Sequence, residues 1–146
     1  MPDISIQQYS HLTAVFYPQF NYDELTTYLK EFELDPAAKL SKLSYGQKKK
    51  FLIAFGLATN ARLLILDEPT NGLDIPSKSQ FRKLMANSLN EKRIIVISTH
   101  QVRDLENLID NVIILEKGAI IYNQSVNEGE QRVDLEQLFI HHVSTI

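Results

Sequence analysis

Leu63-Leu64-Ile65-Leu66-Asp67-Glu68-Pro69 is the stretch that decides the fold of this chain. An apolar run of this length, with no polar residue inside it, is typical of a strand buried on both faces of a sheet. Two adjacent carboxylates follow where the strand ends, and both desolvation and mutual repulsion oppose their ionisation. Such a pair persists most easily where a cation and a reacting water use it. The stretch therefore predicts a core strand that ends in a chemical site.

A second apolar run, Ile94-Ile95-Val96-Ile97, is followed by Ser98-Thr99-His100. Between the two runs, the spacing of apolar residues over Pro76–Asn90 predicts a helix. Strand, helix and strand, with fully apolar strands, indicate a right-handed crossover and a parallel sheet. Open α/β sheets bind ligands at the carboxyl ends of their strands. We therefore expect the Asp67-Glu68 pair and His100 to share one crevice, as part of a nucleotide-hydrolysing site.

The composition is that of an ordinary globular domain. The chain has 146 residues, 44% hydrophobic and 23% charged, with a formal net charge of −3. This balance demands no polyanionic partner, and we expect no nucleic acid. The absence of cysteine excludes disulfides and thiolate metal sites. Apolar runs fall far short of the roughly 18 to 20 residues that span a bilayer. We expect a cytoplasmic chain, with any membrane partner on a separate subunit or chain.

The chain divides into a helical part and an alternating part. Residues 1–60 are predicted to form a helical subdomain, whose last helix begins at Ser44 and ends near Thr59. Residues 61–125 are predicted to form the sheet region, with a further helix over 102–109 and a closing hairpin. Residues 126–146 are predicted to form a terminal helix or tail. The expected fold class is thus α/β, a parallel sheet with an N-terminal helical subdomain.

Leu43-Ser44-Tyr45-Gly46-Gln47 opens the helix that begins at Ser44. Serine at the cap and glutamine three residues later form a capping box, which satisfies two main-chain amides. Lys48-Lys49-Lys50 follows, and cations in the first turns of a helix oppose its dipole. A phosphate on this N-terminus, where amides, dipole and hydroxyl converge, would remove the conflict. Capping alone and capping beside a phosphate site are both open interpretations.

The carboxylates and the imidazole have distinct expected roles. Asp67, at the strand end, suits a hard oxygen ligand for Mg²⁺, and Glu68 suits a base aligned with the attacking water. The alternative is a strand-ending turn, because residues 68–72 are rich in turn formers. His100 is placed to contact a terminal phosphate, or is a satisfied polar residue that follows a strand. Asp74 either caps the following helix or takes part in a subunit interface.

In this order the motifs resemble those of the ATP-binding subunit of ATP-binding-cassette (ABC) transporters. Leu43–Gln47 is similar to the family's signature loop, and Leu63–Glu68 to its Walker B strand with the catalytic glutamate. Asn71–Asp74 is similar to the D-loop, and His100 to the switch histidine. The wording is most similar to bacterial export-type subunits. Tyr45 stands where the family usually has glycine, from which we expect altered packing.

The resemblance implies a P-loop NTPase-like fold that uses ATP and Mg²⁺. It implies a second ATP-binding subunit in a head-to-tail dimer, a transmembrane permease subunit, and a place on the inner face of the cell membrane. The site residues that it implies are Asp67 for the metal, Glu68 and His100 for catalysis, and Ser44, Gly46, Gln47 and Asp74 for contacts with the nucleotide across the dimer.

One family motif is missing. No Gly-x-x-x-x-Gly-Lys-Ser/Thr occurs in these 146 residues. That loop cradles the phosphates and supplies a lysine and a metal-binding hydroxyl. The resemblance therefore predicts the C-terminal part of a longer ABC-type ATPase, inactive by itself. Two alternatives stay open: a non-transport ATPase of the same superfamily, and a non-catalytic interaction module.

Overall fold

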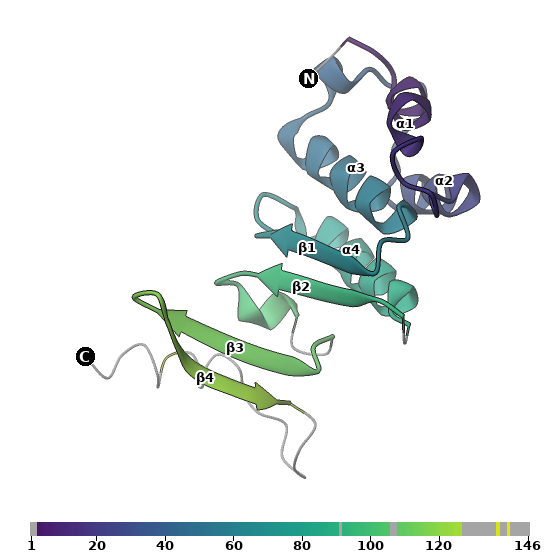
Figure 1. The fold of residues 1–146 in the computed structure, drawn as a ribbon. Coiled ribbons are helices and arrows are strands. Elements are labelled where there is room, and N and C mark those ends of the chain that lie inside the picture. Colours follow the sequence, from purple (N-terminus) through teal and green to yellow (C-terminus); the bar gives the residue numbers. More distant parts are fainter. Residues whose placement is uncertain (1–2, 91, 106–107, 127–136, 138–139, 141–146) are drawn as a thin grey trace. The chain divides into compact units, whose positions relative to one another are not determined.

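The computed structural model describes residues 3–90, 92–105, 108–126, 137 and 140. Its contacts divide the chain into two units, Met1–Thr99 and His100–Ile146. The elements of the first unit, shown in Figure 1, are α1 (Ile6–Ala14), α2 (Tyr22–Glu31), the 3₁₀-helix η1 (Leu40–Lys42), α3 (Tyr45–Ala58), β1 (Leu63–Asp67), α4 (Ile75–Ser88) and β2 (Ile94–Ser98).

Helix α3 is the centre of the helical region. Its buried side chains point in several directions around the helix, which is expected of a helix surrounded by other elements. The Phe55 ring lies 5.7 Å from the Tyr9 ring of α1 and 5.1 Å from the Phe20 ring, between centroids. Helix α1 and the segment after it therefore pack on α3 through aromatic contacts.

Helix α1 is absent from the sequence prediction, although its signal is present in the sequence. The Gln8 amide donates to the Ser5 hydroxyl at 3.1 Å, and the Ser5 amide donates to the Gln8 side chain at 2.9 Å. This is the same capping box as the one predicted at Ser44. The short helix was missed because its apolar stripe is weak.

Strands β1 and β2 are parallel, as predicted. The register runs from Leu63 opposite Ile94 to Asp67 opposite Ser98. Helix α4 connects the two strands and lies behind them in Figure 1. The chain therefore has the predicted α/β class, with the carboxyl ends of both strands at the same edge of the sheet.

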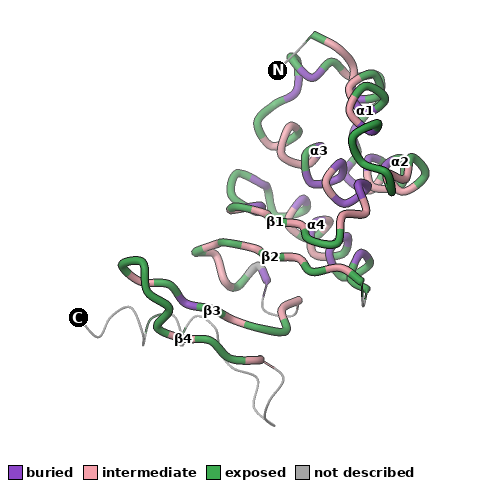
Figure 2. Tube along the Cα trace, viewed as in Figure 1, coloured by how far each residue is buried: buried purple, intermediate pink, exposed green. Residues whose placement is uncertain are grey.

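The prediction that both strands are buried on both faces is wrong for the residues that the structure describes. Leu63 is 54% exposed, Ile65 66% and Ile94 65%. Along each strand, exposed residues alternate with half-buried ones (Figure 2). A Cβ placed on Gly56 would lie 3.2 Å from Leu64 Cδ1, so the half-buried face meets α3. The strands are apolar on both faces, but the helices of this unit cover one face.

The second unit contains the predicted hairpin. Strands β3 (Asn111–Glu116) and β4 (Ala119–Ser125) pair antiparallel. The connecting residues Lys117 and Gly118 have φ of 48° and 80°, as in the type I′ turns that suit two-residue hairpins. Glycine adopts this conformation without steric cost.

The predicted helix over 102–109 is wrong within the described residues. The structure has the three-residue 3₁₀-helix η2 (Val102–Asp104) there. The Leu105 amide donates to the Val102 carbonyl and the Leu108 amide to the Leu105 carbonyl, at 3.0 and 2.8 Å. These bonds span three residues rather than four, which gives tight turns instead of an α-helix. The terminal helix predicted within 126–146 falls outside the described residues, apart from 126, 137 and 140.

Candidate functional site

Asp67 is the last residue of β1 and lies opposite Ser98 of β2. The Ser98 hydroxyl donates to Asp67 Oδ1, and the carboxylate is exposed. An exposed carboxylate at the end of a parallel strand fits Mg²⁺, which is commonly bound through one or two carboxylates together with waters and phosphate oxygens. Across the described ranges, no three metal-binding side chains gather into a preformed cage. Asp67 therefore suits the role of a single protein ligand.

Glu68 is held from the β2 side at two points. Its amide donates to the Ser98 carbonyl at 2.8 Å, and the Thr99 hydroxyl donates to its Oε2 at 2.9 Å. Its φ is 43°, in the left-handed region. For a residue other than glycine this conformation costs about 1–3 kcal/mol and persists where the surroundings determine it strongly. The carboxylate direction is thus set by β2 and by a strained main chain.

The turn interpretation of the same segment is also confirmed. The Asn71 amide donates to the Glu68 carbonyl and the Leu73 amide to the Thr70 carbonyl, both at 3.2 Å. Gly72 has a φ of 78°, which favours glycine. The carboxylate pair and the turn are therefore parts of one local structure rather than competing explanations.

Lys49 contacts this turn, which the sequence did not predict. Its Nζ donates to the Glu68 carbonyl and, at 2.8 Å, to the Asn71 carbonyl. Lys50 Nζ donates to the Phe32 carbonyl at 3.4 Å. Phe32 is the C-cap of α2, and a cation at the C-terminus of a helix interacts favourably with the helix dipole. Two of the three consecutive lysines thus donate hydrogen bonds to main-chain carbonyls. The unfavourable position of these cations near the helix N-terminus was the sequence signal for this role.

The residues of the predicted signature loop form the start of α3. The Gln47 amide donates to the Ser44 hydroxyl at 3.2 Å, and the Ser44 amide to the Gln47 side chain at 2.9 Å, so the capping box is confirmed. A Cβ on Gly46 would lie 3.4 Å from the Gly72 carbonyl oxygen. The helix N-terminus therefore lies directly beside the turn that follows Glu68. Nucleotide contacts of Ser44, Gly46 and Gln47 stay a prediction.

Asp74 caps α4. Its Oδ1 accepts a hydrogen bond from the Ser77 amide at 2.9 Å. Hydrogen bonds from the Ser77 side chain, and then from its main chain, hold the pKa of Asp74 below the ordinary value. The capping interpretation is confirmed, and a role at a subunit interface stays a prediction.

His100 is exposed and is the first residue of the second unit. It follows Thr99, whose hydroxyl contacts the Glu68 carboxylate. The structure thus brings together Asp67, Glu68 and the start of α3 inside the first unit. The shared crevice between His100 and the carboxylates stays a prediction.

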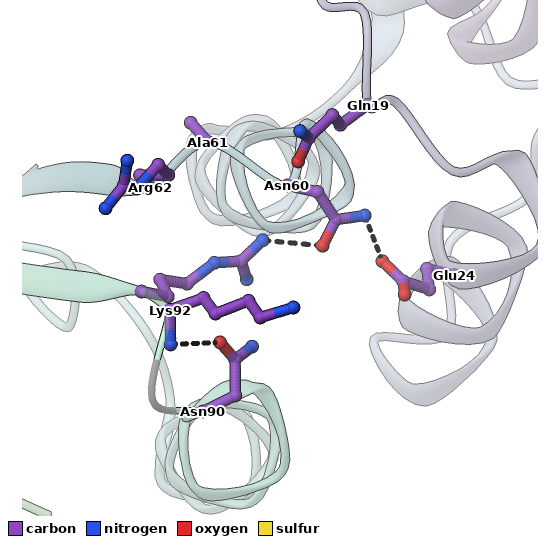
Figure 3. A pocket seen from close by; sticks show the side chains of 8 residues that line it. Gln19, Glu24, Asn60, Ala61, Arg62, Asn90 and Lys92 are labelled. Atoms are coloured by element: carbon purple, nitrogen blue, oxygen red, sulfur yellow. Dashed lines mark hydrogen bonds between the residues drawn. The ribbon is translucent and has the colours of Figure 1, made fainter.

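A polar cleft lies at the other end of the sheet, where β1 and β2 begin (Figure 3). Its volume is about 660 Å³. Arg93 Nη2 donates to the Leu57 carbonyl at 3.0 Å and to Asn60 Oδ1 at 2.8 Å, and Asn60 Nδ2 donates to Glu24 Oε2 at 2.7 Å. None of the predicted site residues lines this cleft. The lining residues are Gln19, Glu24, Asn60, Ala61, Arg62, Asn90, Lys92 and Arg93.

The carboxyl ends of two parallel strands, with the Asp67-Glu68 pair at the end of β1 and a helix N-terminus beside them, form the edge at which open α/β proteins bind ligands. Among family models, the one described as "ABC transporter" matches residues 7–71. An ABC transporter ATP-binding protein, NatA of Bacillus subtilis, is 32% identical over 105 residues, which cover 70% of this chain and 43% of NatA. The family model and this relative support an ABC transporter ATP-binding domain, of which this chain spans a part.

Other relatives carry the names of different transport systems. The high-affinity zinc uptake ATP-binding protein ZnuC of Bacillus subtilis is 42% identical over 81 residues, covering 55% of this chain and 35% of ZnuC. The lantibiotic transport ATP-binding protein SrtF of Streptococcus pyogenes is 35% identical over 100 residues, covering 68% of this chain and 42% of SrtF. The chain thus spans less than half the length of these curated relatives.

Solved structures agree on the fold. An ATP-binding subunit of an ABC transporter superposes with a TM-score of 0.79 at 23% identity, covering 96% of this chain and 62% of that chain. A dimeric bacterial ABC transporter cassette superposes with a TM-score of 0.70 at 21% identity, covering 86% and 58% of the two chains. Within the described ranges, no helix is both long and apolar enough to cross a bilayer.

Proposed function

We propose that this chain is part of the subunit that binds and hydrolyses ATP for an ABC transporter. The proposal rests on the register of β1 and β2, which places Asp67 opposite Ser98. In this register the Glu68 amide donates to the Ser98 carbonyl, and the Thr99 hydroxyl donates to the Glu68 carboxylate. Asp67 and Glu68 are therefore held at the ligand-binding edge of the sheet, next to a helix N-terminus that favours anions.

The proposed chemistry assigns one task to each group. Asp67 would hold Mg²⁺, which neutralises charge on the transferring phosphoryl group when it is bound. Glu68 accepts a proton from the attacking water, and Thr99 orients that carboxylate through its hydroxyl. His100 contacts the terminal phosphate. The N-terminus of α3, with Ser44, Gly46 and Gln47, contacts a nucleotide held by a second subunit, and Asp74 lies at the interface between the two.

The proposed organisation follows from these tasks. Residues 1–60 form the signature subdomain, residues 61–125 belong to the ATPase core sheet, and residues 126–146 form the C-terminal segment. The partners are a second ATP-binding subunit and a transmembrane permease, with no nucleic acid. The chain works in the cytoplasm, on the inner face of the cell membrane. The export direction stays a prediction, since the relatives include named uptake and export systems.

A non-catalytic interaction module is the second candidate, favoured by the absence of the phosphate-binding Gly-x-x-x-x-Gly-Lys-Ser/Thr loop from the 146 residues. The two candidates differ in what precedes the codon for Met1 in the DNA. An in-frame phosphate-binding loop there supports the ATPase, and an authentic start site without one supports the module.

Nucleotide binding by the 146-residue chain alone is a separate test. Because the loop that supplies most phosphate contacts is missing, we expect calorimetry to show Mg-ATP binding weaker than about 1 mM, and no measurable turnover. Tight binding of Mg-ATP would contradict the proposal that most phosphate contacts come from a loop that these 146 residues lack.

A further inference from the structure

The Lys49 ammonium lies where α3 meets the turn after β1. It donates to two carbonyls of that turn, those of Glu68 and Asn71. Lys49 is half-buried, and its Nζ lies 5.6 Å from the centroid of the Tyr45 ring, within cation–π range. The ammonium therefore lies between the turn and an aromatic ring of its own helix.

Tyr45 fits closely over the same turn. A Cβ placed on Gly72 would lie 2.7 Å from Tyr45 Cε1, closer than real atoms approach. Gly72 also has a φ of 78°, so both the conformation and the space at this position favour glycine. The tyrosine at the position where the family usually has glycine thus packs on Gly72 of its own chain, and the altered packing expected from the sequence stays a prediction.

The shape of the turn and the position of Lys49 depend on each other. Two carbonyl oxygens separated by two residues converge on one cation only when the chain between them is bent as observed. Hydrogen bonds from a charged donor are stronger than those between neutral groups. Glu68 needs such support because its φ of 43° is unfavourable for a residue other than glycine.

The contacts of Glu68 come from two directions. Ser98 and Thr99 hold its amide and its carboxylate from the β2 side. Lys49 holds its carbonyl from α3. A change at the N-terminus of α3 can therefore reach the Glu68 main chain through the Lys49 side chain.

We propose that Lys49 is a positioning residue, which fixes the main chain of Glu68 and so links the N-terminus of α3 to the carboxylate within one subunit. The Tyr45 ring lies within cation–π range of the ammonium. The positioning of the turn is independent of any enzymatic activity, whereas its effect on hydrolysis rests on the proposed function.

The test compares Lys49→Met with Lys49→Arg in the whole chain. Methionine keeps most of the apolar stem but cannot donate, whereas arginine can donate to both carbonyls. Amide hydrogen exchange followed by NMR reports the opening of the turn through Asn71 and Leu73, whose amides bond within it. Lys30→Met is the matched control, because Lys30 is exposed in the last turn of α2.

In Lys49→Met we expect the Asn71 and Leu73 amides to exchange about tenfold faster, from the loss of charged hydrogen bonds. Lys49→Arg should stay within about threefold of the natural chain, and Lys30→Met should not differ from it. Unchanged exchange at these amides in Lys49→Met overturns the proposal. Equal acceleration throughout α3 and α4 also overturns it, since that indicates a general loss of stability.

A second readout is the rate of ATP hydrolysis, measured in a longer protein that contains this chain together with a phosphate-binding loop. We expect Lys49→Met to lower kcat by about tenfold with KM for ATP little changed, and Lys49→Arg to restore most of kcat. An unchanged kcat despite faster exchange contradicts the link to Glu68. Absence of hydrolysis in the unmodified protein contradicts the proposed function instead, and the exchange result decides the positioning of the turn by itself.

Discussion

Cations join helix α3 to its surroundings near both of its ends, and the contacts of Arg93 and Lys49 differ in what they hold. At the amino ends of the strands, Arg93 donates to the Leu57 carbonyl and to the Asn60 side chain, at the end of α3. At the carboxyl ends, Lys49 of α3 donates to the Glu68 and Asn71 carbonyls. Arg93, which directly precedes β2, contacts a helix end, whereas Lys49 joins a helix to a strained turn.

We expect the Arg93 contact to affect the stability of the fold and the Lys49 contact to affect hydrolysis. The Leu57 carbonyl and Asn60 belong to the end of a well-packed helix, so a loss of Arg93 should lower the free energy of unfolding and leave the carboxylates in place. The turn at Glu68 carries the proposed base, so changes there should alter hydrolysis more than folding. The contact with the larger expected effect on folding is thus remote from the site, and the following variants test that separation.

The largest expected effect is that of Glu68→Gln on hydrolysis in the protein joined to a phosphate-binding loop. Loss of a general base lowers the rate by about 10²- to 10⁴-fold. Glutamine keeps an oxygen that can accept from Thr99, so the thermal unfolding midpoint should change little and ATP should stay bound. Turnover and nucleotide binding are measured side by side. Undiminished turnover removes Glu68 as the base.

Arg93→Met is expected to do the opposite. It removes hydrogen bonds to the Leu57 carbonyl and Asn60, which should lower the free energy of unfolding by about 1–2 kcal/mol in urea denaturation. Arg62→Met is the matched control, because Arg62 lines the same cleft and is exposed. The control should stay within about 0.5 kcal/mol of the natural chain. Equal losses in both variants would show that the cleft charge, not the Arg93 contact, matters.

Ser5→Ala and Ser44→Ala compare two identical capping boxes. Each removes the side-chain acceptor for an amide in the first turn, of Gln8 or of Gln47. Each should lower the free energy of unfolding by about 1 kcal/mol. Only Ser44→Ala should also slow hydrolysis in the protein joined to a phosphate-binding loop, because only that cap lies beside the turn after Glu68. An equal effect of both variants on kcat contradicts a nucleotide contact at Ser44.

The smallest expected effect is the pH dependence from Asp74. Its pKa in the folded chain lies below the ordinary value of 3.8, so its contribution to stability is present above that value. The contribution is lost as the pH falls through the lower, folded value. Asparagine still caps a helix but does not titrate. The difference in Tm between the natural chain and Asp74→Asn should therefore be constant near neutral pH and change only below about pH 4.

The titration of Asp3 does not affect this comparison. Hydrogen bonds from Lys39 and Ser41 also lower the pKa of Asp3, but that group titrates equally in both proteins and cancels in the difference. A difference in Tm that already changes between about pH 7 and pH 5 would point to another group.

Much of the fold was predicted from local patterns. The helix from Ser44, the parallel pairing of the two apolar runs and the hairpin turn at Lys117-Gly118 all follow from short-range signals. The helix predicted over 102–109 failed because apolar spacing alone does not fix the hydrogen-bond pattern of a short segment. Helix α1 was missed although its Ser5 capping box was readable, since its apolar face is weak.

By itself, the sequence determined the motifs and their order, because capping, strand periodicity and turn chemistry act over a few neighbouring residues. The tertiary structure alone decided which face of β1 and β2 is covered and which lysine serves which carbonyl. It also decided that Tyr45 lies over Gly72. These features depend on side chains and main-chain atoms that are distant along the chain and meet only after folding, so no local pattern encodes them.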